Sequence, residues 1–367
     1  MRCALLITYC KHATVWSLSL DLLHSLSYRT FLKMPSTQKQ VARLAGVSQS
    51  VVSRVFGGGV VSDEAKERVL SIAKSVGYRP DALARSLVTQ RQTDIVGIVM
   101  ADIMNPFYPY VLEKFISALQ KQGLQVLLFN APRDKDVDEE LSLVLQYRVR
   151  GIIITSASLS SRMAAVCREN HTSVVLFNRY IPNTPTWAVS CDNVRGAREI
   201  ADLLLDNKHT KIGYIGGNPN TSTNRDRKRG FIERLAERGK KPALVEDRNY
   251  SYEWGYEAAS GFLRGSSVNA VFCANDIIAL GVMDAIRSEL KLRVPEDISV
   301  VGFDDIPQAS WPLYSLTTLR QPVDEMIDVA INLLDRDLDR KTREPRINLI
   351  KGELVPRSSV RLLPAKR

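Results

Sequence analysis

The feature that most constrains the fold of this chain is the alternation of short β-branched runs with amphipathic segments from residue 93 onward. Short apolar runs predict buried strands, and apolar residues at every third or fourth position predict helices. The expected strands cover 95–100, 125–130, 151–155, 174–178, 211–216, 270–274 and 298–304, and the expected helices cover 110–122, 138–147, 161–169, 194–206, 224–238, 253–264 and 276–290. This alternation predicts an α/β body of open parallel sheets. Since about 270 residues exceed one such unit, we expect two lobes over 92–357.

Polar and aromatic residues gather where the expected strands end. Ligands bind outside the carboxyl ends of strands in open α/β sheets, so these residues are candidates for a ligand site. They are Phe107, Tyr108, Asn178, Asn275 and Asp304, together with Arg225 and Tyr250 near the starts of two helices. Aromatic faces beside a few hydrogen-bonding groups suit a small polar ligand. Each residue taken singly also fits a helix cap or a core position.

Positive charge is concentrated ahead of this body. The 367-residue chain has a formal net charge of +10, and residues 34–91 hold nine Lys or Arg against four Asp or Glu. A small basic module before a nearly neutral body indicates contact with nucleic acid. The alternative interpretation of the charge is a merely soluble surface.

The basic module carries start and stop signals for three short helices. Thr37 and Gln40 form a capping box, Gly46 ends the first helix, and Ser48 and Ser62 can cap the next two. The expected inward-facing residues are Val41, Leu44 and Ala45 on the first helix, Val51, Val52 and Val55 on the second, and Val69, Ile72, Ala73 and Val76 on the third. Gln49, Ser50, Ser53 and Arg54 remain outside on the second helix. The pattern predicts a helix-turn-helix, with an ordinary three-helix bundle as the alternative.

Two further segments flank this module. Residues 81–91 can form a short helix or linker in which Leu83 and Leu87 lie one turn apart, either packing on the body or folding only with a partner. Residues 1–33 precede Met34, and we expect this extension to lie outside the fold.

The module and body together resemble the LacI/GalR family of bacterial transcription regulators. The similarity rests on Ala-Gly-Val-Ser (45–48), Val-Ser-Arg (52–54), Gly-Tyr-Arg-Pro (77–80) and Ala-Arg-Ser-Leu (84–87), and it extends to about residue 360. The resemblance implies a headpiece over 34–80, a hinge helix over 81–91, the two-lobe effector domain and a tail over 358–367. Two departures, Gln40 in place of an acid and a short loop of three glycines at 57–59, bear on contacts just after the second helix.

The resemblance also implies roles for individual residues. Gln49, Ser50 and Arg54 would contact major-groove base edges, Thr37, Ser48 and Ser53 would bind phosphates, and Leu87 would wedge into the minor groove. Phe107, Tyr108, Asn178, Arg225, Tyr250, Asn275 and Asp304 would line the effector site, with Arg225 the most specific of them. The implied effector is a sugar or related metabolite. Because no leucine heptad follows Val355, we expect a homodimer. Its two headpieces, related by a two-fold axis, predict a pseudo-palindromic operator. The resemblance further implies a repressor in the bacterial cytoplasm.

Two other classes of protein share parts of this pattern. A two-lobe solute-binding protein would have the body but no basic headpiece, and an α/β enzyme would need a nucleophile and base that the sequence does not display. The five cysteines are scattered without a Cys-x-x-Cys pair, which argues against zinc and disulfides. We therefore expect no catalytic residues, no metal and no cofactor, and no membrane span.

Overall fold

The computed structural model describes residues 36–79, 93–131, 137–155, 159–182, 184, 186–338 and 347–361. The chain divides into two compact units, residues 1–89 and residues 90–367, and each is described by itself. The predicted extension over 1–33 and the hinge helix over 81–91, with Leu87, lie outside the described residues.

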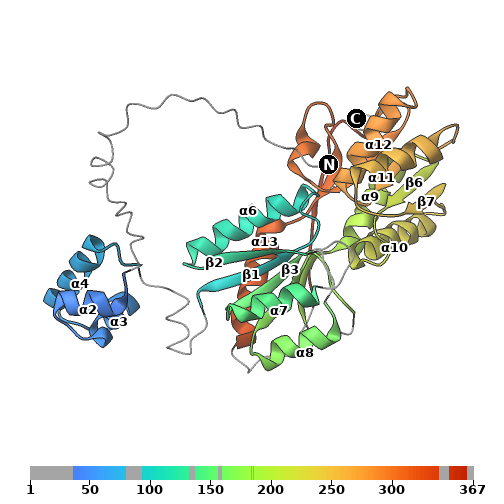
Figure 1. The fold of residues 1–367 in the computed structure, drawn as a ribbon. Helices are drawn as coiled ribbons and strands as arrows, with labels where there is room; N and C mark the ends of the chain where they lie inside the picture. The colour runs from blue at the N-terminus through green and yellow to red at the C-terminus, as the bar shows by residue number, and fades with distance from the viewer. Residues whose placement is uncertain are drawn as a thin grey trace, which may run out of the picture. The chain divides into compact units, whose positions relative to one another are not determined.

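The first unit contains the three predicted helices, α2 (Gln38–Ala45), α3 (Gln49–Gly57) and α4 (Asp63–Ser75) (Figure 1). Their N-caps are the three predicted hydroxyl residues, Thr37, Ser48 and Ser62. The buried core comprises Val41, Ala42, Ala45, Val52, Val69 and Ala73. The inward position predicted for Leu44 is wrong, because this side chain is 48% exposed and Ala42 faces the core instead. Small side chains let these three short helices pack closely.

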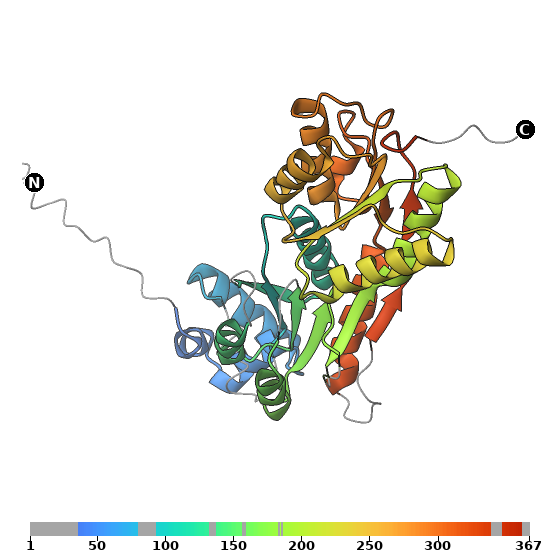
Figure 2. The same cartoon turned by 90° about the vertical axis from the view of Figure 1, so that its right-hand side faces the viewer.

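The second unit contains two separate sheets, as the alternating pattern predicts, and each of them has six strands (Figure 2). The first has the order β11 (Ile347–Ile350), β5 (Trp187–Cys191), β4 (Ser173–Phe177), β3 (Gly151–Thr155), β1 (Ile95–Met100), β2 (Gln125–Asn130), and the second has β12 (Glu353–Val355), β10 (Thr317–Arg320), β9 (Ser299–Asp304), β8 (Ala270–Cys273), β6 (Ile212–Gly216), β7 (Leu244–Asp247). All pairings are parallel except that of β10 with β12. The N-lobe is defined here as the first sheet with its helices, and the C-lobe as the second.

Helices cover both sheets. The N-lobe carries α6 (Phe107–Lys121), α7 (Asp138–Gln146), α8 (Ser161–Glu169) and α13 (Val323–Leu338), and the C-lobe carries α9 (Asn193–Asp206), α10 (Ser222–Glu237), α11 (Tyr252–Ala258) and α12 (Asp276–Ser288). The single helix predicted over 253–264 is instead α11 followed by a π-helical turn, Ala259–Leu263. The sequence pattern did not predict five of the strands or one of the helices, namely β5, β7, β10, β11, β12 and α13. These strands are three to five residues long, which is too short for a distinct period-two pattern.

The chain passes between the lobes three times, after β5, after β10 and after β11. These crossovers pack together around Gly352, where a Cβ would lie 2.4 Å from Leu319 Cδ2 and 3.1 Å from Cys191 Sγ. The Asp192 amide also donates to the Ile350 carbonyl at 2.8 Å. A side chain at position 352 would therefore force the crossovers apart. In the described part of the chain, no helix is long and apolar enough to span a membrane.

Candidate DNA interface and effector site

Helix α3 presents a polar face. Ser48 Oγ accepts a hydrogen bond from the Val51 amide at 3.4 Å, which starts the helix, while Val52 is fully buried beneath it. The side chains on the opposite face are exposed, namely Gln49, Ser50, Ser53 and Arg54, as are the predicted phosphate ligands Thr37 and Ser48. Exposed donors and acceptors over a buried apolar face are what a helix entering a DNA groove needs.

The three-glycine loop shapes the end of this helix. Gly58 has a left-handed backbone (φ 74°), and the Gly59 amide donates to the Arg54 carbonyl at 2.8 Å. A Cβ on Gly59 would lie 2.8 Å from Arg54 Cγ, so only glycine lets the loop turn against the Arg54 stem. Arg54 Nε donates to the Ser50 carbonyl at 3.3 Å. The bond to the Ser50 carbonyl thus directs the Arg54 side chain back along the helix.

On the N-lobe side, the structure brings three predicted effector residues together. Phe107 and Tyr108 are buried in the first turn of α6, and Asn178, directly after β4, donates from Nδ2 to Tyr108 Oη at 3.4 Å. Asn178 has a left-handed backbone (φ 65°), and its buried Oδ1 has no hydrogen-bond partner among the described residues. Burial raises the pKa of Tyr108, and the charges of Arg179, Asp102 and Asp304 act on it. Asp304 belongs to the C-lobe, so Tyr108 lies at the junction of the lobes.

The C-lobe side centres on Arg227, which is not among the site residues predicted from the sequence. Its side chain is 2% exposed, and its guanidinium lies 3.6 Å from the centroid of the Phe303 ring. It donates to Asn193 Oδ1 at 2.8 Å, to the Ala274 carbonyl at 2.6 Å and to Asp304 Oδ1 at 3.2 Å. A buried charge requires such compensation. Arg227 therefore organises the ends of β8 and β9 where Asn275 and Asp304 lie.

Asp304 and Asn275 occupy the ends of neighbouring strands. Asp304 has φ 124° and also accepts from Gln321 Nε2 at 2.7 Å, and burial raises its pKa to about 6 against the lowering effect of Arg227. Asn275 caps α12 through Oδ1, which accepts from the Ile278 amide at 3.2 Å. Asp276 accepts from Thr318 Oγ1 at 2.5 Å, and burial followed by the Asp304 charge raises its pKa to about 7. Two acids with raised pKa values thus meet at this edge of the sheet.

The other two predicted residues lie nearby but outside this buried network. Tyr250 Oη shares hydrogen bonds with Thr221 at 3.1 Å and Thr223 at 2.9 Å. Arg225 is 46% exposed, with Nε 3.9 Å from Asp226 and its guanidinium 5.7 Å from the Tyr180 ring centroid. Arg225 is half-exposed and Arg227 is buried because residues two positions apart on a helix point to roughly opposite sides of it. Arg227, Phe231 and Leu235 recur every four residues and are all buried, a spacing that could have identified Arg227 from sequence.

The two lobes also meet through Tyr180. Its amide donates to Ser222 Oγ at 3.0 Å, and its hydroxyl donates to Asp226 Oδ2 at 2.5 Å. Among the described residues, no group of three His, Cys, Asp or Glu side chains could hold a metal ion.

Comparison with known families matches both units. The family described as bacterial regulatory proteins, lacI family, matches residues 37–81, and the periplasmic binding protein-like domain matches residues 201–360. The regulator RegA of Clostridium saccharobutylicum is 33% identical over 332 residues, covering 89% of this chain and 99% of that protein. GalR of Escherichia coli is 30% identical over 333 residues, covering 89% of this chain and 96% of that protein.

Solved structures agree with these relatives. A lac repressor dimer bound to operator and the anti-inducer ONPF has a TM-score of 0.80 at 25% identity, covering 89% of this chain and 99% of that chain. A complex of the regulator CelR with cellobiose has a TM-score of 0.66 at 28% identity, covering 88% and 99%. The helix-turn-helix, the two α/β lobes and these full-length similarities together place the chain in the LacI/GalR family, and it is a non-enzymatic, DNA-binding transcription regulator with a periplasmic-binding-protein-like effector domain.

Proposed function

We propose that this chain is a cytoplasmic, homodimeric repressor that binds a pseudo-palindromic operator under the control of a sugar or related metabolite held between its lobes. The observation that carries the proposal is that one chain joins an exposed polar recognition helix to a buried polar junction between two lobes. A lac repressor that shares this fold over 89% of the present chain is a dimer bound to operator. Two headpieces related by a two-fold axis require two related half-sites in the DNA.

For the DNA interface, we propose that Gln49, Ser50 and Arg54 contact base edges. An arginine on the exposed helix face can donate two hydrogen bonds to a guanine. Thr37, Ser48 and Ser53 are exposed hydroxyls suited to phosphates, and Leu87 is proposed to enter the minor groove at the operator centre.

For the effector, the groups at the junction favour a neutral, hydroxyl-rich molecule. Asn178 Oδ1 and Gln321 Oε1 are buried acceptors without partners among the described residues, and ligand hydroxyls are donors that can satisfy them. Arg227 already faces the Asp304 carboxylate and uses three N–H groups on protein acceptors, leaving about two of its five. The Arg227–Asp304 pair by itself adds no net positive charge that would attract a phosphate. Phe107, Tyr108, Tyr250, Asn275 and Asp304 complete the proposed lining.

The arginine that contacts the effector can be identified by substitution. We retain Arg225 as a proposed contact at the exposed rim and add Arg227 as the buried one. Arg227→Lys keeps the charge but loses the planar fork, whereas Arg225→Ala removes a half-exposed side chain. Thermal-shift screening of wild type against neutral sugars, sugar phosphates and nucleobases supplies the ligand, and calorimetry on both variants then ranks the two arginines.

The DNA-binding role is tested by selecting bound duplexes from a random pool at fixed salt, because phosphate contacts make affinity strongly salt-dependent. We expect wild type to enrich a pseudo-palindrome. Arg54→Ala should lose about 1–3 kcal/mol of discrimination at one base pair of each half-site. The matched control is Arg68→Ala, which removes an α4 arginine paired with Glu64 at 3.3 Å. If Arg54→Ala selects the same sites as tightly as wild type, the recognition-helix assignment is wrong.

A further inference from the structure

The first crossover between the lobes contains a buried asparagine that bonds to both of them. Asn193 is the first residue of α9 and is 2% exposed. Its Oδ1 accepts from Arg227 Nε at 2.8 Å in the C-lobe, while its Nδ2 donates to Ser190 Oγ at 3.1 Å and to the Cys191 carbonyl at 3.0 Å on β5 of the N-lobe. We propose that Asn193 is the positioning residue that fixes the angle between the lobes and links that angle to Arg227.

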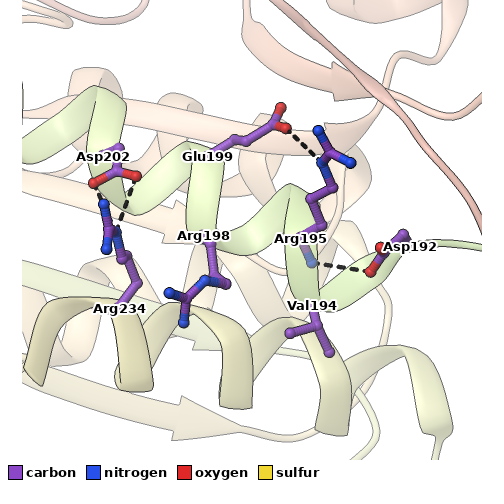
Figure 3. Close-up of a pocket in the computed structure, with 7 residues that line it drawn as sticks. All are labelled: Asp192, Val194, Arg195, Arg198, Glu199, Asp202 and Arg234. Atoms are coloured by element: carbon purple, nitrogen blue, oxygen red, sulfur yellow. Dashed lines mark hydrogen bonds and ion pairs between the residues drawn. The ribbon is translucent and has the colours of Figure 1, made fainter. Parts of the chain in front are cut away.

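Helix α9 packs closely against α10 of the C-lobe and forms ion pairs with it, so its first residue moves with that lobe. Figure 3 shows Asp202 of α9 paired with Arg234 of α10. The Arg234 Nε and Asp202 Oδ1 atoms are 2.9 Å apart, and both residues line a groove of about 430 Å³. Beside it, Arg198 pairs with Glu237 at 2.6 Å. At Gly230 the helices touch so closely that a Cβ would lie 2.3 Å from the Val194 carbonyl oxygen. The bonds from Asn193 to Ser190 and Cys191 therefore connect a helix that is packed against the C-lobe to strand β5 of the N-lobe.

The other end of the link reaches the proposed effector site. Arg227 binds the Asp304 carboxylate, so a ligand that draws either group changes the position of Arg227 Nε against Asn193. The second crossover holds the same carboxylate, because Gln321 Nε2 donates to Asp304 Oδ1 at 2.7 Å. Two of the three crossovers are thus bonded, directly or through Arg227, to one acidic side chain. That an effector acts there rests on the proposed function, but the Asn193 geometry does not.

A single substitution can remove the bonds from Asn193 to β5 while keeping its bond to Arg227. In Asn193→Asp, a carboxylate still accepts from Arg227 Nε but no longer donates to Ser190 or to Cys191, whose carbonyl oxygen it repels. The control is Asn224→Asp. Asn224 is also buried, at 1% exposed, and its bonds to Tyr214, Gly217 and Asp247 all remain inside the C-lobe.

The readout is the distance between the lobes in the full chain without ligand. Spin labels are placed at two exposed positions, Ser117→Cys on α6 and Glu253→Cys on α11. Cys3 and Cys10 are replaced by serine so that they do not take up label. Cys167, Cys191 and Cys273 are kept, because they are buried. Dipolar spectroscopy then gives the distribution of interlobe distances. Asn193→Asp should shift or broaden it, whereas Asn224→Asp should match wild type even where its thermal midpoint is lower.

A second variant tests whether the effect passes through β5. Ser190→Ala should produce a smaller change alone and none in the Asn193→Asp background, because the same bond is already broken. Two results would overturn the inference: a distribution for Asn193→Asp that coincides with wild type, or an equal broadening in Asn224→Asp.

Operator binding separates this inference from the proposed function. Couplings between sites are typically about 5- to 150-fold, so ligand-free Asn193→Asp should change the Kd for the selected operator by at least about 5-fold. If wild type selects no operator while the interlobe distribution still moves, the proposed function fails and the positioning role stands. If the distribution does not move, the positioning role fails whatever the operator measurement gives.

Discussion

Truncation of the buried guanidinium, Arg227→Ala, should destabilise the effector domain far more than truncation of its neighbour. The substitution leaves Asp304 buried with Gln321 as its remaining hydrogen-bond donor, and it leaves Asn193 Oδ1 and the Ala274 carbonyl without the donors they have now. Breaking a buried ion pair by removing one partner costs about 3–5 kcal/mol. Because Gln321 still donates to Asp304, we expect a loss of about 3 kcal/mol in the free energy of unfolding.

Arg225→Ala is the matched control, two residues away on the same helix. Its side chain is 46% exposed and its guanidinium lies 3.9 Å from Asp226, so solvent screening limits the loss to about 1 kcal/mol or less. Urea unfolding of the full chain, followed by tryptophan fluorescence, measures both losses, since Trp254 and Trp311 lie in the C-lobe. In thermal unfolding, a loss of about 3 kcal/mol corresponds to about 6–12 °C.

The pH dependence gives the Arg227 prediction a second signature. Without the guanidinium, protonation of Asp304 removes an uncompensated buried charge, so the deficit of Arg227→Ala should be smaller at pH 5 than at pH 8. The reasoning is refuted if Arg225→Ala loses as much stability as Arg227→Ala, or if the Arg227→Ala deficit grows as the pH falls.

Three further predictions each follow from one contact in the structure. Gly230→Ala should lower the thermal midpoint, because a Cβ would lie 2.3 Å from the Val194 carbonyl oxygen, whereas Gly261→Ala, with nothing within 4 Å, should not. Burial raises the pKa of Asp276 to about 7. The stability contributed by its protonated form is fully present below about pH 4 and is lost as the pH rises through the folded-state pKa. Asp276→Asn should therefore flatten the dependence of the unfolding midpoint on pH. Ser62→Ala should cost about 1 kcal/mol in unfolding of the headpiece, since its Oγ caps α4 through the Ala65 amide.

Each of these predictions has an outcome that contradicts it. Equal midpoints for the two glycine variants would mean that α9 and α10 can separate without cost. An unchanged pH profile for Asp276→Asn would place the titration on another group. A headpiece of unchanged stability in Ser62→Ala, measured by circular dichroism of the full chain, would mean that the cap bond contributes nothing.

Local chemistry determined much of this protein from the sequence alone. Hydroxyl residues at 37, 48 and 62 start three helices because a short side chain can accept from a backbone amide in the first turn, and the structure has all three caps. The strands at 125–130 and 151–155 have the predicted bounds. Parallel topology then brings strand ends to one edge, which is why Tyr108 and Asn178 meet although 70 positions separate them.

Tertiary structure decided what local patterns could not. Strands β10, β11 and β12 are three or four residues long, and they form because neighbouring strands supply their hydrogen bonds. The choice between Arg225 and Arg227 depends on how α10 rotates against the sheet, which the contact of Gly230 with Val194 sets. Asn193 has a role because a crossover brings β5 and α10 to its two sides. Period and capping chemistry extend over a few residues, whereas the partner of a buried charge is fixed only when distant segments pack together.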